Sequence, residues 1–160
     1  RDVYYEDIGN LAIGQGPIEV TPLQAAQLML TVVNGGIEKK PFIVKEIVDS
    51  QGNTTTPTLQ EGQNRVLSLE TSKNIMVALK NAVKYGTGIR ALPSLELGES
   101  AGKTGTAEIT DDIYHAWFLG YYPAETPDYV ISLFIERGGS GAVYAAPVFK
   151  EIIENINSIE

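Results

Sequence analysis

Three consecutive segments rich in aromatic and β-branched residues constrain the fold of this 160-residue chain most strongly. Short links separate the segments, which span residues 101–109, 115–122 and 129–136. Strands that follow one another this closely usually pair as neighbours, so the pattern predicts an antiparallel meander. The chain ends in an apolar stripe at helical spacing, made of Phe149, Ile152, Ile153 and Ile156. We expect this terminal helix to pack on the sheet.

Two further helices are predicted ahead of the strands. The first begins with Thr21 as N-cap and Pro22 at the first helical position, and the NGG sequence at 34–36 ends it. Its apolar stripe consists of Leu23, Ala26, Leu30 and Val33. The second helix runs from about residue 68 to residue 85, and its apolar face consists of Ile75, Leu79, Ala82 and Val83.

The remaining segments are predicted to be less regular. Residues 1–20 are glycine-rich and irregular, 41–50 have the composition of a strand, 51–53 form a turn and 53–64 form an exposed loop. Helices come first, then strands, then a last helix, which is an α+β pattern. Residues 1–160 are expected to form a single domain, since the chain has enough apolar residues for a core. Because the chain does not open with Met, we expect it to be a partial domain from a longer protein.

Composition argues against several classes of function. The net charge is −8 and the 12 basic residues are scattered, so no nucleic-acid partner is expected. Cys is absent, and the lone His115 cannot build a histidine-based metal site by itself. We therefore predict no metal and no cofactor. No window approaches the roughly 20 apolar residues of a membrane span.

The segment AGKTGTAE (residues 101–108) combines a cation, hydroxyl groups and glycine on a predicted strand. At a sheet edge, free backbone groups can pair with an extended peptide, and Gly105 has no side chain to hold such a ligand away. Lys103 can attract a carboxylate, while Thr104 or Thr106 can hydrogen-bond it. Strand alternation puts Lys103 and Thr106 on opposite faces, so both reach one ligand only at an edge. A K-T-G tripeptide alone equally fits a glycine-kinked surface strand with an exposed lysine.

The surrounding segments resemble one family, the penicillin-binding proteins. The K-T-G segment and HAWFLGYYP (115–123) are similar to the family's active-site strand and the strand that follows it. Further similar segments follow in order: IGQG (13–16), VTPLQ (20–24), NGG (34–36), YGTG (85–88), ERGG (136–139) and AAP (145–147). The resemblance covers nearly the whole chain and is strongest to the class B, monofunctional type that serves cell elongation.

The resemblance implies the C-terminal portion of the penicillin-binding and serine β-lactamase-like fold. It also implies an activity for the complete protein, a D,D-transpeptidase that binds penicillin and cross-links peptidoglycan stem peptides through a serine acyl-enzyme. The family brings three motifs together: S-x-x-K with the acylated serine, S-x-N, and K-T-G. Only K-T-G has a convincing match here, so we expect the nucleophile to lie in a missing N-terminal portion and the isolated chain to be soluble and inactive.

The resemblance also assigns roles to four residues. Lys103 would support proton transfer and bind the carboxylate of a peptide or β-lactam. Thr104 and Thr106 would contact that carboxylate, with Gly105 between them in the substrate-binding strand. The backbone N–H of Thr106 would be one of two oxyanion-hole donors, a contribution typically worth about 2.7–4 kcal/mol in the transition state.

Two serine patterns are rejected as family motifs. Ser100 and Lys103 fit S-x-x-K literally, but that motif needs a helix to bring its two side chains together, whereas these residues enter a strand. Ser72 and Asn74 fit S-x-N, but they lie in the first turns of the second helix, where we expect solvated surface.

His115 could also suggest a Ser-His-Asp triad with Asp111 or Asp112. The family uses lysine rather than histidine as base, and His115 opens an aromatic strand. A structural role is therefore favoured.

Two alternative functions are kept. The chain could be part of a serine β-lactamase or β-lactam sensor domain, although the GQG and TPLQ segments argue against this. It could also be a non-catalytic binding or packing module.

The expected partners are a stem peptide ending in D-Ala-D-Ala, β-lactams and the missing N-terminal half of the same protein. A parent protein of this type would lie outside the bacterial cell membrane on an upstream anchor. Without the missing half, the chain should expose an apolar face, and two copies could pair as a homodimer to cover it.

Overall fold

The computed structural model describes residues 5–16, 18–56, 64–110 and 112–159. The helices, in chain order, are α1 (Tyr5–Ala12), α2 (Pro22–Val33), α3 (Leu69–Lys84), the short η1 (Ile89–Ala91), η2 (Leu95–Leu97) and η3 (Gly141–Ala145), and α4 (Ala146–Ile159). The strands are β1 (Ile47–Val48), β2 (Thr54–Thr55), β3 (Ala101–Thr110), β4 (Ile113–Tyr122) and β5 (Tyr129–Ile135).

Strands β3, β4 and β5 form an antiparallel sheet in that order. Lys103 pairs with Leu119 and Gly105 with Trp117, while Trp117 also pairs with Phe134 of β5. The predicted meander and the α+β class are confirmed. Within the described residues β3 has a neighbour on one side only, so its other edge is open.

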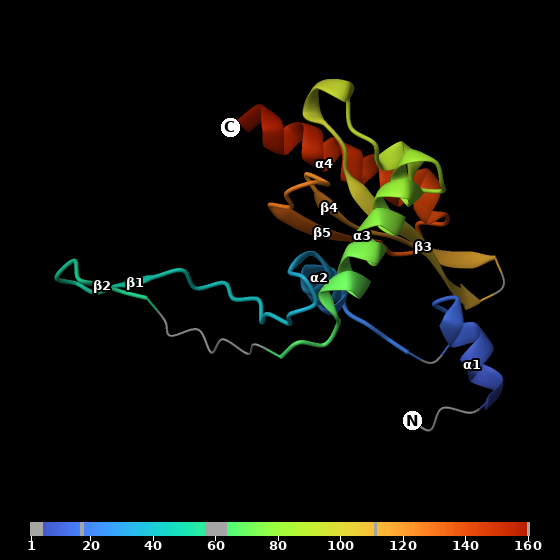
Figure 1. The fold of residues 1–160 in the computed structure, drawn as a ribbon, viewed down its shortest axis with the longest axis horizontal. Helices are drawn as coiled ribbons and strands as arrows, with labels where there is room; N and C mark the ends of the chain where they lie inside the picture. The colour runs from blue at the N-terminus through green and yellow to red at the C-terminus, as the bar shows by residue number, and fades with distance from the viewer. Residues whose placement is uncertain (1–4, 17, 57–63, 111, 160) are drawn as a thin grey trace.

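Helix α4 covers one face of the sheet (Figure 1). Phe118 and Ala116 alternate along β4 toward this face and are fully buried with Phe149 and Ile153 of α4. The rings of Phe118 and Phe149 lie 4.5 Å apart between centroids. Burial of an aromatic or large aliphatic side chain contributes about 1.5–3 kcal/mol, so this layer is a major source of stability. The apolar stripe predicted for the last helix is confirmed.

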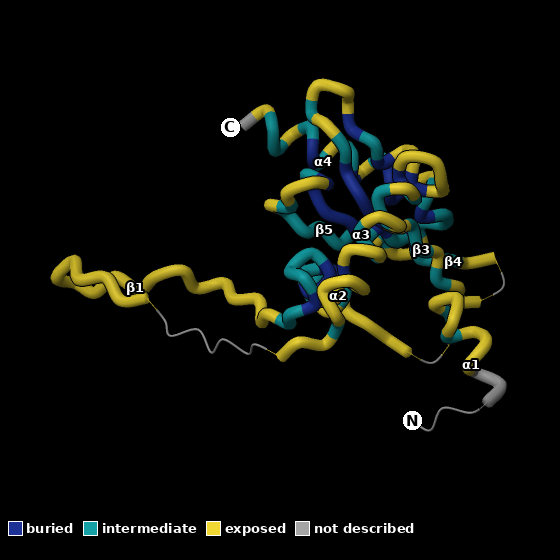
Figure 2. Tube along the Cα trace, viewed as in Figure 1, coloured by how far each residue is buried: buried dark blue, intermediate teal, exposed yellow. Residues whose placement is uncertain are grey.

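Helices α2 and α3 cover the opposite face (Figure 1). Tyr121 of β4 is buried there against Met29 and Val32 of α2, and its hydroxyl donates to the carbonyl of Met76 at 3.3 Å. Burial raises the pKa of Tyr121 to about 12, so this phenol stays neutral as part of the core. Figure 2 shows the buried residues concentrated in the sheet and in the helices on its two sides.

Helix α2 has the predicted ends but a different buried face. Thr21 caps it, and its side chain and that of Gln24 form a reciprocal capping box. Leu23 of the predicted stripe is 61% exposed, whereas Met29 and Val32 are the buried apolar residues. Both sets satisfy helical spacing, and contact with α3 and β5 decides between them.

Helix α3 agrees closely with the prediction. Ser68 accepts a hydrogen bond from the backbone N–H of Thr71 at its start, and Tyr85 follows its last helical residue. Val83 is fully buried, and the other three residues of the predicted face are partly buried.

Two irregular regions differ from the prediction. A helix, α1, forms within residues 1–20, which were expected to lack one. The strand expected over 41–50 is reduced to Ile47–Val48, which pairs with Thr54–Thr55. The predicted turn between them is present, and the Asp49 carboxylate accepts hydrogen bonds from the backbone N–H groups of Gln51 and Asn53 within it. Most of the loop expected at 53–64 lies outside the described residues.

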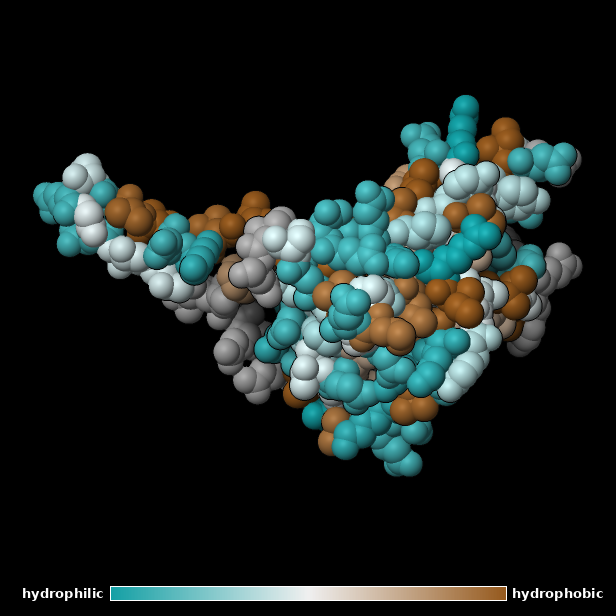
Figure 3. All heavy atoms as spheres, turned by 90° about the horizontal axis from the view of Figure 1, so that it is seen from above, coloured by the Kyte–Doolittle hydropathy of each residue, from teal (hydrophilic) through white to brown (hydrophobic). Residues whose placement is uncertain are grey.

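The β1–β2 hairpin and the chain leading to it project away from the body as an arm (Figure 2). Exposed apolar side chains lie along this arm (Figure 3), namely Phe42, Ile43, Val44, Ile47 and Val48. An isolated arm of this kind buries too little apolar surface to fix a strand over its whole predicted length. Pairing of two copies of the chain stays a prediction.

A network of ion pairs joins α3 to Glu99, which lies two residues before β3. The Glu99 carboxylate lies 2.6 Å from Lys80 Nζ and 2.9 Å from Lys84 Nζ, and Lys80 also pairs with Glu125. Hydrogen bonds from Lys80 and then Lys84 lower the pKa of Glu99 to about 2. The network therefore fixes the start of β3 relative to α3.

We predict that Glu99→Gln removes part of the pH dependence of stability. A carboxyl whose pKa is lower in the folded than in the unfolded chain stabilises the fold above its unfolded pKa, about 4.3, and this contribution is lost as the pH falls through about 2. Urea unfolding between pH 2 and 5 should show a shallower rise for Glu99→Gln than for the parent chain. Glu154→Gln, which removes the i,i+4 pair with Lys150, is the matched control. An unchanged slope in Glu99→Gln would contradict the assignment.

Candidate functional site

The open edge of β3 carries a cluster of one ammonium group and two hydroxyl groups. Lys103 Nζ donates to the backbone carbonyl of Thr104 at 3.0 Å and lies 3.3 Å from Thr104 Oγ1. Thr87, in the turn after α3, contributes a hydroxyl 2.8 Å from that of Thr104 and 3.4 Å from Lys103 Nζ. A cation and two hydroxyls in mutual contact form a surface suited to an anion.

The strand alternation explains how this cluster forms. Lys103 pairs with Leu119, whose side chain packs in the core on the α2–α3 side, whereas Thr104 pairs with Phe118 on the α4 side. The two side chains therefore start on opposite faces, and the lysine reaches Thr104 around the open edge. The expectation that Lys103 and Thr106 reach one ligand at this edge stays a prediction, because the side chain that Lys103 contacts on β3 is Thr104.

Gly105 and Thr106 lie against two different neighbours. Gly105 sits opposite Trp117, and a Cβ atom at Gly105 would lie 3.1 Å from the Trp117 Cβ. Thr106 Oγ1 accepts a hydrogen bond from the backbone N–H of Gly141 at 3.2 Å. A Cβ atom at Gly141 would collide with the carbonyl oxygens of Gly105 and Trp117, so η3 touches the sheet through bare backbone. The Thr106 hydroxyl thus has its hydrogen-bond partner in η3.

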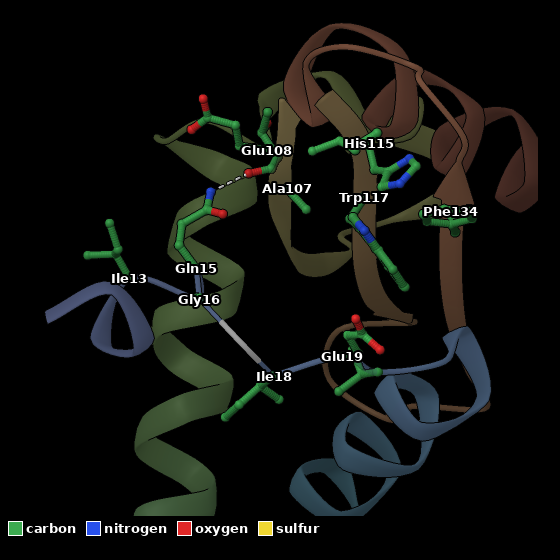
Figure 4. Close-up of a pocket in the computed structure, with 14 residues that line it drawn as sticks. Ile13, Gln15, Gly16, Ile18, Glu19, Ala107, Glu108, His115, Trp117 and Phe134 are labelled. Atoms are coloured by element: carbon green, nitrogen blue, oxygen red, sulfur yellow. Dashed lines mark hydrogen bonds between the residues drawn. The ribbon is translucent and has the colours of Figure 1, made fainter. Parts of the chain in front are cut away.

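A cleft of about 600 Å³ lies beside the second half of β3 (Figure 4). One wall is the segment between α1 and α2, and Gln15 from this segment donates its side-chain N–H to the backbone carbonyl of Thr106 at 2.8 Å. The opposite wall consists of side chains from the three strands, including Ala107, Glu108, His115, Trp117 and Phe134. Thr106 itself lines this cleft and lies two residues along β3 from Thr104 of the ammonium–hydroxyl cluster.

The two rejected serines are both buried and hydrogen-bonded. Ser100 is 1% exposed and donates to the carbonyl of Ala91 at 2.9 Å, which leaves it inaccessible to a ligand. Ser72 is fully buried and donates to the carbonyl of Val32, so the expectation of a solvated Ser72 is wrong. This hydroxyl joins α3 to the end of α2, and a small polar residue fits there because its hydroxyl can donate to a buried carbonyl in the last turn of a helix.

His115 has a backbone partner and an aromatic neighbour. Its Nδ1 accepts a hydrogen bond from the backbone N–H of Arg137 at 3.1 Å, and its ring lies 4.7 Å from that of Phe134. Asp112 adopts a positive φ of 66° in the β3–β4 turn, and Asp111 lies outside the described residues. These contacts support the structural role predicted for His115.

Sequence reasoning gave no role to Thr87 or Gln15, although both lie in segments used for the family resemblance. Nothing in the spacing of Thr87 and Thr104 indicates their contact, because it depends on how α3 packs beside β3. In the part of the chain that the structure describes, no helix is both long and apolar enough to cross a membrane. Nor do three or more acidic or histidine side chains there converge on a possible metal site.

Helices cover both faces of the antiparallel β3–β4–β5 sheet, which is an α+β architecture. Residues 4–154 match the family model described as the penicillin binding protein transpeptidase domain. The chain therefore belongs to the penicillin-binding protein transpeptidase family, and the family predicted from the sequence is confirmed.

Relatives with established names agree with this membership. The peptidoglycan D,D-transpeptidase PbpA of Mycobacterium tuberculosis is 29% identical over 156 residues, which cover 92% of this chain and 31% of the relative. The penicillin-binding protein PbpB of Mycolicibacterium smegmatis is 36% identical over 163 residues, which cover 89% of this chain and 24% of the relative. The chain thus spans about a quarter to a third of the length of these relatives.

A solved structure shows the same fold. Penicillin-binding protein A from M. tuberculosis, in an imipenem acyl-enzyme complex, superposes with a TM-score of 0.79 at 28% identity. The superposition covers 93% of this chain and 34% of that structure. The fold class predicted from the sequence is confirmed by this likeness.

We predict that Gly141→Ala destabilises the chain by about 1–3 kcal/mol, the usual cost of overpacking. The added methyl group must push η3 away from the Gly105 and Trp117 carbonyls. Urea unfolding should measure the loss, and the amide NMR signal of Thr106 should shift. Gly9→Ala in α1, where a Cβ atom meets nothing within 4 Å, is the control and should not lower stability. Equal stability of the two variants would show that η3 does not press on the sheet.

Proposed function

We propose that this chain supplies the K-T-G wall of a D,D-transpeptidase site, which binds the terminal carboxylate of a stem peptide or the carboxylate of a β-lactam. The observation that carries the proposal is the contact of Lys103 with Thr104 at an open strand edge beside a cleft. An extended peptide could pair with the β3 backbone while its carboxylate meets the ammonium and hydroxyl donors. The acyl-enzyme formed by the related penicillin-binding protein A supports a β-lactam as ligand.

Each predicted residue has a role in this proposal. Lys103 holds the carboxylate by charge and supports proton transfer, and Thr104 donates a hydroxyl hydrogen bond to the same group. Gly105 lets the ligand approach the backbone. The N–H of Thr106 serves as one oxyanion donor. Its hydroxyl oxygen accepts from the Gly141 N–H, which leaves the O–H hydrogen to donate to the ligand.

The serine nucleophile is proposed to lie outside these 160 residues. Ser100 and Ser72 are buried and hydrogen-bonded to backbone carbonyls, so neither fits the part. In the complete protein, a serine hydroxyl would attack the carbonyl carbon of the penultimate D-Ala and release the terminal D-Ala. An amine of a neighbouring strand would then take the acyl group and regenerate the serine. The isolated chain would bind without reacting.

The setting of the complete protein follows from the same proposal. Its substrate, peptidoglycan, lies outside the cytoplasmic membrane, so we propose an extracytoplasmic position with an anchor elsewhere in the protein, and a role in cell elongation. The names of the relatives favour a transpeptidase over a β-lactamase or a β-lactam sensor. The alternative of a non-catalytic binding module applies only to the isolated chain, which we expect to bind a ligand without reacting with it.

We predict that Lys103→Ala in the complete gene product slows acylation by benzylpenicillin at least a hundredfold. The change removes both a charge-assisted hydrogen bond and a group that supports proton transfer. The second-order rate constant can be measured by intact mass spectrometry against time. Lys73→Ala, which removes an exposed lysine from α3, should leave the rate unchanged. Wild-type reactivity of Lys103→Ala would refute the proposed role of this strand.

A further inference from the structure

Thr87 is the one member of the ammonium–hydroxyl cluster that lies outside β3. It is an exposed residue in the turn between α3 and η1, and its hydroxyl contacts both Thr104 and Lys103. The Thr87 hydroxyl can therefore influence the hydrogen bonds of both side chains.

The turn holds Thr87 in place through its two flanking glycines. Gly88 is buried, and its backbone N–H donates to the carbonyl of Ala82 at 3.0 Å. A Cβ atom at Gly86 would lie 2.9 Å from the Ala82 carbonyl oxygen, and one at Gly88 would lie 3.1 Å from the same atom. The turn therefore packs tightly on the end of α3, next to the fully buried Val83. Thr87 is consequently presented to β3 by a well-supported framework.

The hydrogen-bond inventory of the cluster leaves one donor without a partner inside it. Lys103 has three N–H donors and no acceptor, and each hydroxyl has one donor and two lone pairs. Lys103 has three acceptors within reach, namely the Thr104 carbonyl and the two hydroxyl oxygens. One hydroxyl must donate to the other, because the two oxygens lie 2.8 Å apart. One O–H hydrogen then remains without an acceptor inside the cluster.

We propose that Thr87 is a positioning residue that orients the Thr104 hydroxyl toward the carboxylate of the ligand. When Thr87 donates to Thr104 Oγ1, that oxygen accepts from Thr87 and from Lys103, and its own hydrogen points outward. Without Thr87, the Thr104 hydroxyl loses this hydrogen bond, and its hydrogen can turn to water or to other acceptors. The inference rests on the proposed function, because it assumes a carboxylate at this edge.

The test compares ligands that differ only in the carboxylate. Acylation of the complete gene product is measured with benzylpenicillin and with its methyl ester, which has no negative charge. Thr87→Val, nearly equal in size to threonine, should lower the rate constant for the acid about fivefold, the scale of one hydrogen bond, with little change for the ester. Thr87→Ser keeps the hydroxyl and should keep the rate. Thr54→Val, in the exposed arm, is the matched control and should behave as the parent protein.

The possible outcomes separate this inference from the proposed function. An equal loss for acid and ester in Thr87→Val, or no loss for either, would overturn the role of Thr87. The same holds if Thr87→Ser loses as much as Thr87→Val. If Lys103→Ala abolishes the preference for the acid while Thr87→Val keeps it, the proposed function stands and only Thr87 is wrong. If the complete protein is not acylated, or Lys103→Ala keeps the preference, the proposed function itself fails.

Discussion

Strand β4 is the element on which the rest of the structure depends, because each of its faces builds one of the two cores. Phe118 lies under α4, and Tyr121 lies under α2 and α3, so alternation along a single strand holds both helical layers. Its backbone pairs with β3 on one side and β5 on the other. A strand that is packed on both faces and hydrogen-bonded along both edges has little freedom to move, and it holds its neighbours in place. The edge strand β3 is therefore well fixed although its outer edge is open.

This arrangement explains why the candidate site is found where it is. A functional edge needs a backbone that is fixed yet accessible, and β3 is fixed by β4, by the η3 backbone over Gly105 and by the Glu99 ion pairs before it. Side chains of both faces meet only around its open edge, where Lys103 reaches Thr104. The turn with Thr87 joins them because α3 ends there. The chemistry of the cluster is therefore a consequence of packing more than of local sequence.

The sequence could predict the parts of the fold that local patterns control. Three aromatic-rich runs with short links predict the meander, and Thr21 and Ser68 mark helix starts by their caps. Features that depend on tertiary contacts could not be predicted from the sequence. The buried face of α2, the burial of Ser72 and the contact of Thr87 with Thr104 all depend on how elements far apart in sequence pack. The carboxylate-binding role of Lys103 and Thr104 could be predicted from their side chains and their motif. The role of Thr87 could not, because it depends on the packing of α3 beside β3.

The central claim is that these residues hold a carboxylate ligand at an edge but do not attack it. Intact-mass analysis of the 160-residue chain after incubation with benzylpenicillin tests this claim most directly, with the complete gene product as the positive control. We predict a single penicilloyl group on the complete protein and none on the chain alone. A stoichiometric adduct on the chain, mapped to Ser100 or to any other serine within it, would contradict the claim, because the nucleophile would then lie among the residues described here.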